Sequence, residues 1–292
     1  ITGMTIDFNN ITINTNNTNN DGNVTLTHNT PQDTVTVDAG TGGTVQITPV
    51  TTSAVIETAT NNSANISEDV FYDIDSFNVS AAFALIGDAS HTGNIFVGNE
   101  VAAIDFGQPA NVQVRNSSSG QIFLGSDYDS AGGFLTLTSG NGVTLQDLSA
   151  NNTATINLGA GALTVTGAAT LADNINITAT GGITFSSTID ADNAGSNDRT
   201  LTMTSGTGST IAINGNVGAS QALSGLTITQ SNGTTFSGNV DVSDSNSGTI
   251  TITDTENGSD ITFAGSVTAD TLDLAQQGYD LVFNGGGTFT DA

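Results

Sequence analysis

Residues 181–240 read GGITFSSTIDADNAGSNDRTLTMTSGTGSTIAINGNVGASQALSGLTITQSNGTTFSGNV. Short triplets with apolar ends and a small middle residue, usually Thr, recur through this stretch: ITF at 183–185, LTM at 201–203, IAI at 211–213 and LTI at 226–228. In a β-strand this alternation points two side chains to one face and one to the other. Residues that favour helices are scarce here, whereas Thr, Val, Ile, Asn and Gly dominate. The stretch therefore predicts many short strands.

The triplets recur at a regular interval outside this stretch as well. A first strand of each unit is predicted to begin at Leu135, Ile156, Ile175, Leu201, Leu226, Ile250 and Leu272. The steps between these positions are 21, 19, 26, 25, 24 and 22 residues, with a mean near 23. This interval fits one coil of a parallel β-helix better than the spacing of about 8 to 12 residues that separates strands in antiparallel sheets.

Two further inward positions complete the predicted coil. A second strand is expected to begin at Val143, Leu163, Ile183, Ile211, Ile261 and Leu281. Four residues after the second strand a third inward residue is expected, at Ile189, Val217, Val240 and Val267, and Gly215, Gly238 and Gly265 lie in three of these intervals. Glycine lets a chain turn a corner without a Cβ clash. We predict an all-β fold, a right-handed parallel β-helix (β-solenoid) of about 23 residues per coil, whose inward side chains stack on those of the next coil.

The repeat divides the chain into four segments. Residues 133–292 form the regular β-solenoid, 77–132 form less regular coils, and 1–57 form irregular amino-terminal coils. Residues 58–76 break the alternation and collect acidic residues, so we expect an acidic insertion or a lateral loop there.

Charge excludes several classes of partner. The chain has 2 basic residues (Arg115 and Arg199) against 28 acidic ones, a formal net charge of −26. A field of this sign repels nucleic acids and anionic lipid surfaces. No segment approaches the roughly 20 apolar residues needed to cross a bilayer, so direct membrane insertion is not expected. The chain has no Cys, which excludes disulfides, thiol catalysis and Cys-ligated zinc.

Two acidic turn segments are the candidate metal sites. Each alternates oxygen-bearing side chains around a Gly, which is how short loops surround Ca²⁺ with six to eight oxygens. Neither completes an EF-hand loop. The plainer alternative is that turns require Asp, Asn and Gly for conformational reasons, and both interpretations remain open. The predicted ligands of a structural Ca²⁺ are Asp190, Asp192, Asn193 and Asp198 in one segment, and Asp254, Glu256 and Asp260 in the other.

The case for catalysis is weaker. Paired carboxylates could act on a glycosidic bond, as in carbohydrate-active β-helices (polysaccharide lyases or hydrolases), but acidic pairs are abundant here by composition alone. Arg115 and Arg199 are the only fixed cations, and His28 and His91 are isolated. We therefore predict that the chain is not an enzyme and keep a carbohydrate-active β-helix as the alternative. A third alternative is an ice-binding face made of the outward Thr residues.

The motifs GGITF, GNVG followed by LSGLTIT, and F-x-G-x-V lie within residues 133–292. They resemble the β-strand repeats of filamentous-haemagglutinin-like adhesins and autotransporter passengers. The resemblance implies a rigid β-solenoid at the cell surface or in the extracellular space. We expect a non-enzymatic structural protein: a segment of a surface fibre, adhesin stalk or surface layer. Its expected partners are other copies of itself, end to end or lateral, and cell-surface or extracellular glycans.

Overall fold

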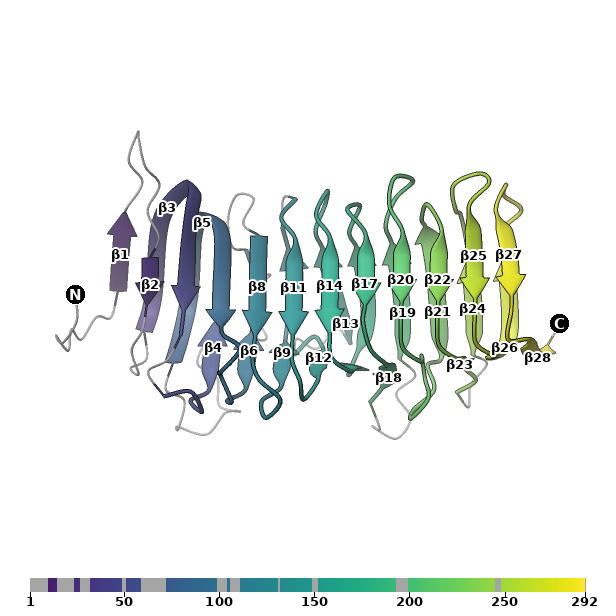
Figure 1. The fold of residues 1–292 in the computed structure, drawn as a ribbon, viewed down its shortest axis with the longest axis horizontal. Helices are drawn as coiled ribbons and strands as arrows, with labels where there is room; N and C mark the ends of the chain where they lie inside the picture. Colours follow the sequence, from purple (N-terminus) through teal and green to yellow (C-terminus); the bar gives the residue numbers. More distant parts are fainter. Residues whose placement is uncertain are drawn as a thin grey trace.

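The computed structural model describes residues 10–14, 24–26, 32–48, 51–58, 72–98, 104–105, 111–130, 132–148, 152–192, 199–244 and 248–291. All regular secondary structure in these ranges is β-strand, and the strands stack along one long axis with β1 at one end and β28 at the other (Figure 1). The chain is a right-handed parallel β-solenoid, as predicted. No helix in the described ranges is long and apolar enough to span a membrane.

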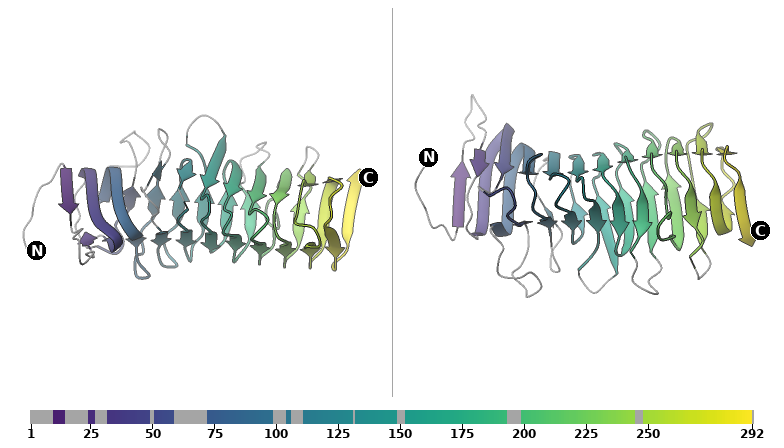
Figure 2. Two further views of the ribbon diagram at one scale, coloured as in Figure 1. Left: turned by 90° about the horizontal axis from the view of Figure 1, so that it is seen from above. Right: turned by 60° about the horizontal axis from the view of Figure 1, so that its bottom comes forward.

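Each coil of the regular part has three faces, which we name A, B and C in chain order. Face A contains β8 (Asn111–Arg115), β11 (Leu135–Thr138), β14 (Leu163–Thr166), β17 (Ile183–Phe185), β20 (Ile211–Ile213), β22 (Thr234–Phe236), β25 (Asp260–Phe263) and β27 (Asp280–Phe283). Face B contains β6 (Ile95–Val97), β9 (Ile122–Leu124), β12 (Val143–Leu145), β15 (Ala169–Leu171), β18 (Ile189–Ala191), β23 (Val240–Val242), the first half of β26 (Val267–Leu274) and most of β28 (Gly287–Asp291). Face C contains β7 (Ile104–Asp105), β10 (Tyr128–Asp129), β13 (Thr153–Asn157), β16 (Asn174–Thr178), β19 (Thr200–Thr204), β21 (Gly225–Gln230), β24 (Thr249–Ile252) and the second half of β26. Figure 2 shows the strands of successive coils lying side by side along the rod.

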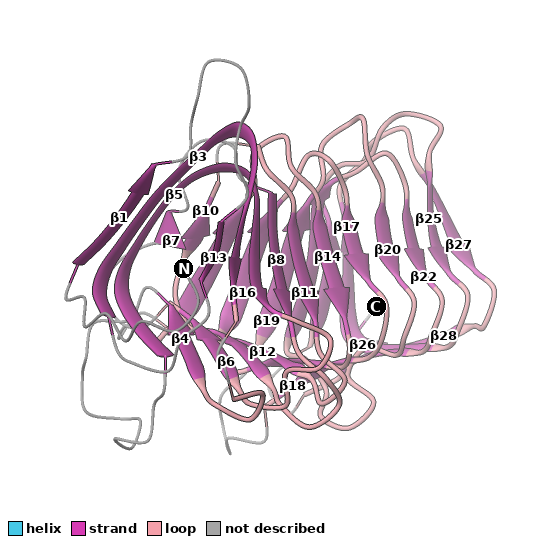
Figure 3. Cartoon of the chain, turned by 60° about the vertical axis from the view of Figure 1, so that its left-hand side comes forward, coloured by secondary structure: helices cyan, strands magenta, loops and turns pink. Residues whose placement is uncertain are grey.

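The amino-terminal part continues the same stack with longer strands. Strands β3 (Gln32–Ile47) and β5 (Tyr72–Gly87) bend around a corner and pair in parallel over both of their halves, with register shifts near Gly40 (Figure 3). β1 (Asn10–Asn14) and β2 (Val24–Leu26) pair with the two halves of β3, and β4 (Ile56–Thr58) joins face B beside β6. Of the predicted insertion at 58–76, residues 59–71 lie outside the described residues and 72–76 open β5. That prediction stays a prediction.

Strand register shows how the coils differ in length. Successive partners on face A are Val112, Leu135, Leu163, Ile183, Ile211, Thr234, Ile261 and Leu281. The steps between these partners are 23, 28, 20, 28, 23, 27 and 20 residues, so a coil takes roughly 25 residues, close to the predicted 23. Because the strands keep their register while the steps vary, the loops absorb the differences in length.

The assignment of strands to faces that was predicted for the first regular coil is wrong. Leu135, expected among the first strands, pairs with Leu163 on face A. Val143, expected among the second strands, pairs with Ala169 on face B. Apolar triplets look alike on all three faces, and the 21-residue step from Leu135 to Ile156 is close to one coil by coincidence.

One predicted stack is also displaced by two residues. Ile175 lies beside Ala154, not beside Ile156, which pairs with Ile177. A single Ala is a weak apolar marker in a sequence, so the triplet that begins at Ile156 was the more visible one. From Ile175 onward the prediction is confirmed, because Leu201 and Leu226 are register partners.

The third inward positions and their corner glycines are also confirmed. Ile189, Val217, Val240 and Val267 follow one another in register on face B. The glycines before them approach the previous coil so closely that a Cβ built on Gly238 would lie 2.6 Å from the carbonyl carbon of Gly215. A close vertical approach of two backbones, and not a left-handed φ, therefore requires glycine at this corner.

The core consists of columns of apolar side chains that run along the rod axis. On face A the rings of Phe236 and Phe263 stack at 4.8 Å, and those of Phe263 and Phe283 stack at 5.1 Å, both nearly parallel. Offset ring stacking adds to the hydrophobic contribution of such large side chains. Each coil is too thin to enclose these rings alone, so neighbouring coils bury them for each other.

The corner geometry predicts that Gly238→Ala is destabilising. The added methyl group would meet backbone atoms that cannot move without disturbing the coil below, and such overpacking costs about 1 to 3 kcal/mol. Gly208→Ala is the matched control, because nothing lies within 4 Å of its Cβ position. That substitution should be neutral or slightly stabilising, since it restricts the unfolded chain. Urea unfolding of both variants tests this, and equal stability of the two would contradict it.

Candidate functional site

In the first predicted calcium segment, the described carboxylates accept hydrogen bonds from other groups of the chain. Asp190 Oδ1 accepts the backbone N–H groups of Ser220 (2.7 Å) and Gln221 (3.4 Å) in the next coil. Asp192 receives two hydrogen bonds from Arg199, from Nε at 2.7 Å and from Nη2 at 3.0 Å. Asn193 and Asp198 lie outside the described residues.

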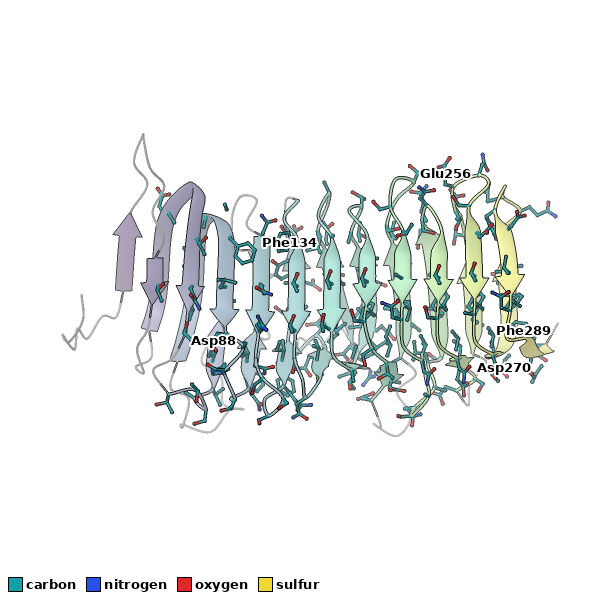
Figure 4. All side chains as sticks on the ribbon, viewed as in Figure 1. Asp88, Phe134, Glu256, Asp270 and Phe289 are labelled. Carbon is teal, nitrogen blue, oxygen red and sulfur yellow. The ribbon has the colours of Figure 1, made fainter. Side chains whose placement is uncertain are left out.

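The second predicted segment lies in the turn between β24 and β25. Asp254 Oδ2 accepts a hydrogen bond from Gln230 Nε2 at 3.3 Å, whereas Glu256 and Asp260 are exposed. Figure 4 shows Glu256 on the outer loops, on the opposite side of the rod from Asp270. Asp260 is the register partner of Asp280, so two carboxylates of like charge occupy neighbouring rungs of face A.

Within the described ranges, no three acidic or His side chains are grouped so that they could hold a metal ion. The two predicted segments lie at different places on the coil, the first at β18 on face B and the second between β24 on face C and β25 on face A. Calcium binding by either segment stays a prediction.

A polar cluster in the described part of the chain was not predicted from the sequence. It joins Asp147, Asp173, Asp192 and Arg199 from neighbouring coils, and Arg199 is only 7% exposed. Arg199 Nη1 lies 3.5 Å from Asp173 Oδ1 in addition to its paired contact with Asp192. The other oxygen of Asp173 accepts the backbone N–H of Asp147 at 2.7 Å. Asp147 and Asp173 are 26 residues apart, which corresponds to one coil. This spacing is the only feature of the sequence that indicates their contact.

The electrostatics of this cluster follow from burial and from its unequal charges. Burial raises the pKa of Asp173, and the charges of Asp147 and Asp192 raise it further, against the hydrogen bond from Asp147 and the charge of Arg199. The hydrogen bond to Asp192, with the charges of Asp192 and Asp173, raises the pKa of Arg199 in spite of burial. Arg199 thus stays charged and compensates carboxylates in two coils.

We predict that Arg199→Gln destabilises the rod by about 3 kcal/mol, because it leaves Asp173 and Asp192 largely buried without their cation. Arg115→Gln is the matched control, since Arg115 is the other basic residue of the chain and its side chain is exposed at the end of β8. The control should change stability by less than about 0.5 kcal/mol. Thermal and urea unfolding measure both, and a loss of similar size in the two variants would contradict the role of the cluster.

Aromatic side chains also line part of the outer surface. The rings of Phe96 and Phe123 stack at 4.5 Å on the outer side of face B, and Phe83 meets Phe134 edge to face at 5.5 Å. All four side chains are partly exposed. These contacts repeat, on the outside of the rod, the rung-to-rung stacking that builds its core.

Comparison of the chain with protein-family models, curated proteins and solved structures gives no match. What the chain does is therefore argued from the solenoid and from the side chains described above.

Proposed function

We propose that the chain is a non-enzymatic structural segment, a rigid β-solenoid rod in an extracellular fibre, adhesin stalk or surface layer. One observation carries the proposal: a continuous column of buried side chains on face B, none more than 2% exposed. The column consists of Ile56, Ile95, Ile122, Val143, Ala169, Ile189, Val217, Val240 and Val267.

The same column explains how such a rod would resist bending. Backbone hydrogen bonds between neighbouring coils run along the rod axis on three faces, and closely packed side chains fill the space that the faces enclose. A local bend would have to open these ladders on one side and compress the apolar columns on the other. A rod of this kind suits a spacer that holds something at a fixed distance from a surface. The resemblance to haemagglutinin-like and autotransporter repeats agrees with this role and stays part of the proposal.

The outermost described coil supports growth of the rod along its axis. Among the described strands, β27 pairs only with β25 and β28 only with β26. Leu274 is 41% exposed although Ile252, its partner one coil earlier, is fully buried. An open strand edge with exposed apolar side chains is a template for another strand. We propose that a coil of a second copy of the chain stacks there.

Association of the purified chain tests the second-copy case. We expect self-association that rises with concentration and shows as lengthened rods in negative-stain images. Leu274→Lys should weaken it, because the substitution places an ammonium group on the stacking surface. Leu148→Lys is the matched control, since Leu148 is 44% exposed on the side of the rod. Light scattering after size exclusion, with EDTA or with millimolar Ca²⁺, measures the mass. A monomer under all conditions, or an equal effect of both variants, would contradict association through this edge.

A carbohydrate-active β-helix is separated from a structural rod by its products. Incubation with acidic and neutral polysaccharides should release neither reducing nor unsaturated ends. Release that disappears when a surface carboxylate is replaced by its amide would overturn the non-enzymatic assignment. Retention of a glycan without release would support the predicted glycan partner.

A further inference from the structure

Three consecutive corners between face A and face B contain buried polar side-chain atoms without hydrogen-bond partners, unlike the described corners that follow them. Their described residues are 48 with 51–55, 88–94 and 116–121, and backbone hydrogen bonds stack these corners on one another. Thr92 N donates to Thr52 O at 2.6 Å, and Ser117 N donates to His91 O at 2.7 Å. The middle corner is thus attached to the coil on either side of it. Figure 4 shows Asp88, at the start of this corner, among the side chains along the lower edge of the rod.

The imidazole side chain of His91 is buried in the middle corner and makes no hydrogen bond. The residue is 1% exposed, and neither Nδ1 nor Nε2 of its ring has a hydrogen-bond partner. Asn116 Oδ1 and Ser117 Oγ, in the next corner, are likewise buried and unpartnered, as is Thr48 Oγ1 in the preceding one. Within the described residues, all buried side-chain polar atoms that lack a partner belong to these three corners.

The charges around His91 are few. Burial lowers its pKa from the ordinary value of 6.5, and the opposing influences of the Asp88 carboxylate and of the Asn94 backbone are weaker. Asp88 is engaged by Ser90, whose N–H and hydroxyl donate to Asp88 Oδ1 at 2.6 and 2.7 Å. Burial raises the pKa of Asp88, but these hydrogen bonds, with His91, lower it overall, so this carboxylate is ionised.

The neighbouring corners supply no other anion. Residues 48–55 and 116–121 contain no titratable side chain, and Arg115, at the end of the adjoining β8, is a cation with an exposed side chain. A protonated His91 in the closed corner would therefore be a buried cation, and among the described residues Asp88 is its one nearby counter-charge.

We propose that the His91 corner is an acid-sensitive joint of the rod. Residues 88–94 stay packed between their neighbours while the imidazole is neutral, and they detach from both neighbouring corners when it is protonated. The sign follows from linkage: the closed corner excludes the proton, so its stability is complete above about pH 6.5 and falls as the pH drops below that value. The change is local, because the later corners at 139–142, 186–188, 214–216, 237–239 and 264–266 contain no titratable residue.

Amide hydrogen exchange measures the opening directly. We would measure exchange between pH 7.5 and 5.5. The protection factors of Thr92, Gly93 and Ser117 should be constant above about pH 6.5. Below that pH they should decrease by up to tenfold per pH unit, as expected for the uptake of one proton. The amides of Ser186 and Ser237, which donate to backbone carbonyls of the preceding coil at later corners, should keep their protection. His91→Gln should abolish the pH dependence at Thr92, Gly93 and Ser117.

The imidazole signals of the wild-type chain give a second readout that needs no folded variant of His91. The chain has two His residues, so His28→Gln identifies the His91 signal. We expect the pKa of His91 to lie below 6.5 while the corner is closed. Protection at Ser117 that does not change with pH, the same loss of protection in His91→Gln, or an ordinary pKa for His91 would each overturn the proposal.

Discussion

Vertical, in-register contact between equivalent positions of successive coils is the interaction on which the whole structure depends. No coil has an interior of its own, because its inward side chains are covered only when the next coil repeats them at the strand spacing of about 4.8 Å. Leu201 and Leu226, or Phe236 and Phe263, show the same contact on different faces. Loops differ by several residues per coil without harm, provided that each strand returns to its rung.

Stacking also determines what happens at the corners. Where two corners approach closely, as at Gly215 and Gly238, the backbone has no room for a Cβ. Polar side chains that are enclosed between corners must find hydrogen-bond partners within the stack. Arg199 with its carboxylates is a compensated case, since hydrogen bonds and opposite charges join neighbouring coils. His91 is an uncompensated one, and for that reason its protonation state matters to the local packing.

The sequence is enough to predict the fold, but it does not show to which face every strand belongs or which polar side chains meet. A repeating apolar triplet and a glycine at a fixed distance before Val217, Val240 and Val267 predict coils of about the right length, because both features follow from stacking. The face to which Leu135 belongs is not encoded in its own triplet, since LTLT would fit any of the three faces. Which carboxylates meet Arg199 depends on the lengths of the loops, and these lengths follow no pattern in the sequence. The contacts of Arg199 with Asp173 and Asp192 are therefore visible only in the structure. The calcium prediction rested on turn composition, and Asp190 and Asp192 show that such residues also serve the chain's own hydrogen bonds.

Distance measurements between spin labels on face A test the stacking most directly. The chain has no Cys, so pairs of introduced cysteines carry the only labels. Thr136 and Thr262 are five rungs apart in the register, and Gln113 and Val282 are seven rungs apart. Pulsed electron spin resonance should give narrow distributions centred near about 24 Å for Thr136→Cys with Thr262→Cys and about 34 Å for Gln113→Cys with Val282→Cys. Broad distributions, or distances that do not increase by about 10 Å between the two pairs, would contradict the stacked-coil account.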